Sequence, residues 1–86
     1  MPAHRVLRGS DGELILVRLT VPAHDLEDSL ETLAGFDFPV NPALFHRGTE
    51  TAIEFPAYSG KLPQIEAALA DRGHLETFSL LAGISS

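Results

Sequence analysis

The chain has no cysteine and no tryptophan, and only one methionine and one tyrosine among its 86 residues. Without cysteine it forms no disulfide, no thiolate nucleophile and no thiolate zinc site. Basic residues are also few: six lysines and arginines stand against twelve aspartates and glutamates, so the net charge is −6. This balance argues against a nucleic-acid partner, because binding to a phosphate backbone needs clustered cations.

Long apolar runs are missing as well. No stretch has the length needed to cross a bilayer, and the first five residues are not followed by the apolar run of a signal peptide. We therefore expect no membrane partner and a cytoplasmic location. A chain of this length forms one domain with a thin core, since it buries only about 60% of its unfolded surface. Burial against a partner would add to its stability.

The strongest strand signal is Glu13–Val21, which is apolar on both faces until Arg18 and Thr20. Such a strand lies in the middle of a sheet with neighbours on both sides. We expect residues 1–12 to form an N-terminal arm, 13–82 a single domain and 83–86 a C-terminal tail. The arm can pair as a short strand at Arg5–Arg8, reach a partner chain, or stay loose.

Two helices are predicted between strands. Leucines at helical spacing indicate a first helix that Asp25 is placed to cap and that ends at Gly35. The second helix is expected to begin at Ser59 and Gly60, with Pro63 tolerated in its first turn.

Three further strands complete the pattern. Val40–His46 is predicted as an edge strand because Pro42 within it cannot donate a hydrogen bond. A tight turn at Gly48 leads to a strand at Glu50–Ala57, and Leu75–Leu81 is the last strand. The order predicts an α+β, ferredoxin-like βαββαβ sandwich, with a four-stranded antiparallel sheet and two helices on one face.

The predicted hairpin has a definite register. Closing it at Gly48 pairs Arg47 with Glu50, Leu44 with Ile53, and Phe45 with Ala52. The core face is then expected to hold Leu44, Ile53 and Phe55.

The face of the sheet away from the helices is too apolar to be left in water. A few exposed apolar residues are common on one-sided sheets, but we favour the alternative that a second copy docks here and forms a homodimer. The candidate interface residues are Leu14, Leu16, Arg18, Phe45, Glu54 and Tyr58. Thr20, Ala52 and Pro56 are expected beside them, with Thr77 and Ser79 from the last strand.

Catalytic and metal chemistry have little support in the residues. The four histidines lack metal-ligand spacing, so we predict no metal and no cofactor. His24 beside Asp25 could serve as a ligand or acid–base group, although a solvated residue before a helix is the commoner case. Arg18 and Glu54 on the open face fit an ion pair better than a catalytic centre. We predict no catalytic residue and lean toward a non-enzymatic protein.

The element order, the element lengths and the apolar face of residues 13–82 resemble ACT-like regulatory domains, which dimerise and bind amino acids at the interface. The family's proline in the first strand–helix loop is matched at Pro22, whereas its glycine has no counterpart between Val21 and Leu26. The resemblance implies a small regulatory or ligand-binding module, with a small-molecule ligand near Pro22, His24 and Asp25.

Two other classes share this layout. Dimeric α+β barrel enzymes enclose a pocket against the sheet and need a catalytic side chain there. Small maturation chaperones use the bare sheet face to hold a peptide.

Overall fold

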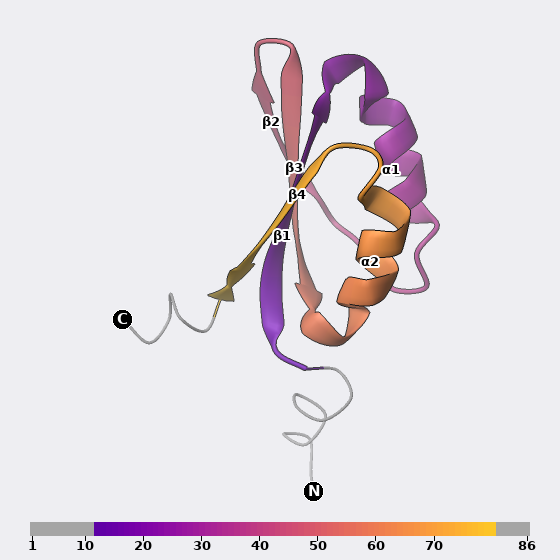
Figure 1. Cartoon of the computed structure of the whole chain (residues 1–86), viewed down its shortest axis with the longest axis vertical. Coiled ribbons are helices and arrows are strands. Elements are labelled where there is room, and N and C mark those ends of the chain that lie inside the picture. Colours follow the sequence, from indigo (N-terminus) through magenta and orange to yellow (C-terminus); the bar gives the residue numbers. More distant parts are fainter. Residues whose placement is uncertain (1–11, 81–86) are drawn as a thin grey trace, which may run out of the picture.

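The computed structural model describes residues 12–80 (Figure 1). The elements are β1 (Leu14–Pro22), α1 (Leu26–Ala34), β2 (Ala43–Arg47), β3 (Glu50–Tyr58), α2 (Leu62–Leu69) and β4 (His74–Ser79). Short 3₁₀ turns at Ala23–Asp25 and Ser59–Lys61 lead into the two helices. Apart from Gly12, the predicted arm with its possible strand Arg5–Arg8 lies outside the described residues, as does the predicted tail.

The strands form one sheet in the order β2-β3-β1-β4, and every neighbouring pair is antiparallel. Both helices lie on the same side of this sheet (Figure 1). The predicted α+β class, with a four-stranded antiparallel sheet and two helices, is therefore confirmed. The central place of the first strand and the edge place of the strand after Pro42 are confirmed too.

The core lies between the sheet and the helices and follows the alternation of the central strands. Because successive side chains of a strand point to opposite faces, every second residue of β1 and β3 is buried. The buried apolar side chains are Ile15, Val17, Leu19, Val21, Ile53, Phe55 and Ala57 from the sheet, and Leu33, Ile65 and Leu69 from the helices. The other face of the same two strands has no helix packed on it (Figure 1).

The β2–β3 hairpin has the predicted register, with Arg47 opposite Glu50 and Leu44 opposite Ile53. Gly48 in its turn has φ +59°, a conformation that a side chain disfavours. One detail of the prediction was wrong, because the strand begins at Ala43, after Pro42. Leu44 lies on the core side as predicted, but it is 38% exposed there. The buried core draws on the central strands β1 and β3, not on the edge strand.

The last strand differs from its prediction in position and in face. It runs from His74 to Ser79, and it pairs His74 with Thr20 and Phe78 with Leu16. Phe78 therefore lies on the open face, whereas Thr77 and Ser79, expected there, lie on the side of the helices. Directly before the strand, Gly73 approaches β1 so closely that a Cβ atom would collide with the carbonyl oxygen of Thr20. The strand joins the sheet with His74 opposite Thr20, and this register places His74, Glu76 and Phe78 on the open face.

The helix starts also differ from the expected caps. The Asp25 side chain makes no capping hydrogen bond; its backbone carbonyl accepts one from Ser29 Oγ at 3.0 Å. Ser59 Oγ accepts a hydrogen bond from the Glu13 amide at 3.1 Å, so it ties the start of β1 to the end of β3. In both cases the 3₁₀ turn leads directly into the α-helix. Pro63 lies in the first turn of α2, as predicted.

Candidate functional site on the open sheet face

The open face consists of five rows of side chains that run across the strands, because paired residues of neighbouring strands share a face. We name each row by its β1 residue. From the start of β1 the rows are Tyr58–Leu14, Pro56–Leu16–Phe78, Ala43–Glu54–Arg18–Glu76, Phe45–Ala52–Thr20–His74 and Arg47–Glu50–Pro22. The six residues predicted as an interface, Leu14, Leu16, Arg18, Phe45, Glu54 and Tyr58, all lie on this face.

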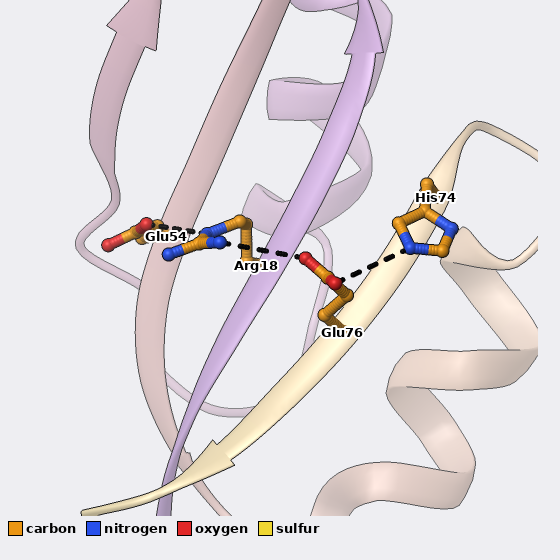
Figure 2. Close-up of polar contacts among 4 residues, drawn as sticks. All are labelled: Arg18, Glu54, His74 and Glu76. Carbon is orange, nitrogen blue, oxygen red and sulfur yellow. Dashed lines mark hydrogen bonds and ion pairs between the residues drawn. The ribbon is translucent and has the colours of Figure 1, made fainter.

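The Arg18 row is a line of alternating charge (Figure 2). Arg18 Nε donates to Glu54 Oε2 at 2.7 Å, and Arg18 Nη1 lies 3.6 Å from Glu76 Oε1. On the far side of Glu76, its Oε2 lies 3.6 Å from Nε2 of His74. The guanidinium carbon of Arg18 also lies 4.8 Å from the centre of the Phe78 ring, a cation–π distance. The guanidinium is therefore held at the middle of the face by groups from the two strands that flank β1.

Exposed apolar side chains flank the charged row on both sides. Leu14 is 40% exposed, Phe78 39% and Phe45 49%. The sequence interpretation missed the open-face residues of β4, which are His74, Glu76 and Phe78. Alternation groups these three residues together, but it does not indicate which face of the sheet they occupy.

A hollow of about 340 Å³ lies over the charged part of the open face. Residues of all four strands line it: Arg18, Thr20, Phe45, Arg47, Glu50, Ala52, Glu54 and Glu76. The lining thus combines two guanidinium groups, three carboxylates and one phenyl ring. This combination suits noncovalent binding of a polar molecule that also has an apolar part.

A second hollow, of about 450 Å³, lies beside the connection between α1 and β2. Phe36 and Phe38 stack there with their ring centres 5.1 Å apart. Lys61 Nζ lies 5.5 Å from the centre of the Phe38 ring and 3.6 Å from Asp37 Oδ1. These contacts tie the connection between α1 and β2 to the start of α2. They give the side chains of this connection a structural role.

None of the three predicted ligand residues of the first strand–helix loop lines either hollow. Pro22 ends β1 opposite Glu50. His24 has a side chain that is 80% exposed, and its Nδ1 lies 3.3 Å from Asp25 Oδ1. The loop itself is held by a 2.8 Å hydrogen bond from the Ala23 amide to the carbonyl of Thr49 in the hairpin turn. His24 and Asp25 form an exposed surface pair.

Within residues 12–80, no three histidine, aspartate or glutamate side chains come together as a metal-binding group. None of the helices in that range combines the length and apolar character of a membrane span. Comparison of the chain with protein-family models, with curated proteins and with solved structures gives no match. Function is therefore inferred from the geometry of the open face.

Proposed function

We propose that the chain is a small, non-enzymatic binding module with a ferredoxin-like fold, which associates with a second copy of itself through the open sheet face. The order β1-α1-β2-β3-α2-β4 and the sheet order β2-β3-β1-β4 support the ferredoxin-like arrangement. The resemblance to ACT-like domains adds a regulatory role to this proposal, because those modules dimerise and bind small molecules at the interface.

The observation that carries the proposal is the exposed apolar surface of the open face. Leu14, Phe45 and Phe78 come from three different strands and are each at least 39% exposed. The helices pack on the opposite side, so they cover none of these side chains (Figure 1). Exposed apolar side chains on an uncovered sheet face, here on both sides of a charged row, favour a protein–protein interface.

The size of the face is sufficient for a dimer. Its strands have nine, five, nine and six residues. At about 3.3 Å per residue and 4.8 Å between strands, the flat footprint is about 460 Å² per copy. Because side chains project from the flat sheet, the accessible area that two copies bury together exceeds roughly 1,000 Å², the lower end for specific interfaces. Only near-complete overlap of the two faces reaches this value.

The hollow on the same face gives the module a place for a ligand. Two copies that pack through their open faces would bring the hollows together, and a small polar molecule would then be held between them. The lining of the hollow combines guanidinium and carboxylate groups with one phenyl ring, which suits recognition of a ligand that has polar and apolar parts.

Self-association is tested by placing a charge within the apolar part of the face. Leu16→Arg puts an unpaired guanidinium between Pro56 and Phe78. We expect the mass from light scattering to fall from about twice 9.3 kDa to 9.3 kDa, with a lower melting temperature. Glu27→Arg, on the exposed side of α1, is the control and should change neither quantity.

A different result would redirect the proposal. If the wild type has a mass of 9.3 kDa at high micromolar concentration and Leu16→Arg leaves its melting unchanged, the open face is no interface between copies. The peptide-holding function of the maturation chaperones then becomes the better account of the apolar face.

A further inference from the structure

The rows of the open face restrict how a second copy can pack on it. Apolar and charged rows follow one another along the strands, with the Leu16 row directly before the Arg18 row. Packed sheets run with their strands aligned within about 30° or cross at right angles. If the sheets cross at right angles, the Arg18 row of one copy lies along β1 of the other copy. Its charged side chains then meet apolar Leu14 and Leu16 of that copy. Aligned strands avoid this mismatch.

Among aligned arrangements, the direction of the two-fold axis decides which rows meet. An axis across the strands at the Arg18 row stacks Arg18 on Arg18 and Glu54 on Glu54. If the same axis lies at the Thr20 row, Glu54 of one copy meets Glu50 of the other. If it lies toward the Leu16 row, the charged side chains of one copy meet apolar side chains of the other. If the axis is parallel to the strands, each row lies over the same row of the second copy. Apolar rows then meet apolar rows.

The position of a parallel axis is then fixed by charge and by area. An axis over β1 again stacks Arg18 on Arg18 and brings Glu54 onto Glu76. An axis between β1 and β4 overlaps only those two strands of each copy, which is less than the area that a specific dimer needs. An axis between β1 and β3 overlaps all four strands and lays Arg18 over Glu54.

We infer that the second copy packs with its two-fold axis parallel to the strands, between β1 and β3, so that Arg18 of each copy pairs with Glu54 of the other. This inference rests on the proposed self-association. At the centre, two guanidinium groups and two carboxylates alternate, so that each Arg18 faces a carboxylate and not another guanidinium. Glu76 of each copy, 3.6 Å from Arg18 Nη1, lies over Ala43 in this arrangement and meets no second carboxylate there. Leu16 lies over Pro56 and Leu14 over Tyr58 in the same arrangement, and Phe45 lies over His74.

This packing also completes the hollow. The lining residues come from the Arg18, Thr20 and Pro22 rows, and the same rows of the partner lie above them. The two hollows therefore face one another and form one chamber with walls from both copies. A site for a small polar ligand is incomplete without the second copy.

The charge pairing is tested by mixing two variants. Arg18→Glu gives a face with carboxylates at both positions, and Glu54→Arg gives a face with guanidinium groups at both. Each variant alone should self-associate at least about 100-fold more weakly than the wild type, because like charges meet across the axis. An equimolar mixture should restore a dimer in sedimentation velocity, and native mass spectrometry should identify it as one copy of each. Mixing Arg18→Glu with Glu27→Arg is the control: Glu27→Arg should dimerise with itself as the wild type does, and native mass spectrometry should show no appreciable dimer with one copy of each.

The position of the axis is tested with the wild-type charges in place, so a folding defect of the charge variants does not affect it. Since the chain has no cysteine, Phe45→Cys and His74→Cys each introduce a single thiol. In the inferred dimer residues 45 and 74 of different copies lie about 10 Å apart, whereas the two copies of residue 45 lie about 17 Å apart. A short bismaleimide should join the mixed variants efficiently and Phe45→Cys to itself poorly.

The failures of the two proposals are distinguishable. A monomeric wild type overturns the self-association and this inference together. A dimeric wild type in which Phe45→Cys links to itself more efficiently than to His74→Cys overturns the inferred axis alone. So does a dimeric wild type whose Arg18→Glu and Glu54→Arg variants, both folded by circular dichroism, self-associate normally or form no mixed dimer.

Discussion

Phe55 and Phe45 lie on opposite faces of the same sheet and offer a matched pair of substitutions. Phe55 is the largest fully buried side chain, with 0% exposure, whereas Phe45 is 49% exposed. Phe55→Ala removes a ring from the core and leaves a cavity, at a cost of about 3–5 kcal/mol. A chain of this length has a total stability of about 4–13 kcal/mol. Phe55→Ala should therefore lose a large part of the free energy of unfolding, and Phe45→Ala less than about 0.5 kcal/mol.

Urea unfolding followed by far-ultraviolet circular dichroism measures both variants, because the chain has no tryptophan for fluorescence. The protein should be dilute enough to be monomeric, so that loss of a partner contact does not contribute. The reasoning is refuted if Phe55→Ala unfolds within about 1 kcal/mol of the wild type. It is also refuted if Phe45→Ala is equally destabilising, since the core would then extend to the open face.

Further substitutions at four positions test local features of the fold by the same unfolding assay. Gly73→Ala should cost about 1–3 kcal/mol because its Cβ collides with the carbonyl of Thr20, whereas Gly35→Ala, which meets only an ordinary 3.5 Å contact, should be neutral or slightly stabilising. Gly48→Ala should cost about 1–2 kcal/mol from its positive φ alone, since nothing lies within 4 Å of the added atom; an unchanged midpoint would contradict the turn geometry. Ser29→Ala should cost about 1 kcal/mol through the lost hydrogen bond to the Asp25 carbonyl, and the larger Ser29→Leu should cost more because Ser29 is fully buried.

The parts of the fold that sequence patterns predicted are those governed by local rules. Alternation in β1 placed Ile15 and Val17 on the core face, and the tight turn at Gly48 fixed the hairpin register residue by residue. The six predicted interface residues share one face for the same reason. Whether that face is an interface stays a prediction.

The errors arose where a long-range contact decides the local outcome. The face of Phe78 depends on the register in which β4 joins β1, with His74 opposite Thr20. Leu44 is on the predicted face, but it is partly exposed in an edge strand. The periodicity of a single strand indicates neither the register of its pairing nor the degree of burial. Glu76 was missed as a second partner of Arg18 because it shares the alternation of Phe78.

The open face as an interface between copies is tested most directly by diluting isotope-labelled protein and following its backbone amide resonances. From high to low micromolar concentration, the amides of Leu16, Arg18 and Glu54 should shift as the dimer dissociates. Those of Glu27 and Glu66, which are exposed on the two helices, should stay in place. Resonances that do not change with concentration, or shifts confined to the helices, would contradict self-association through the open sheet face.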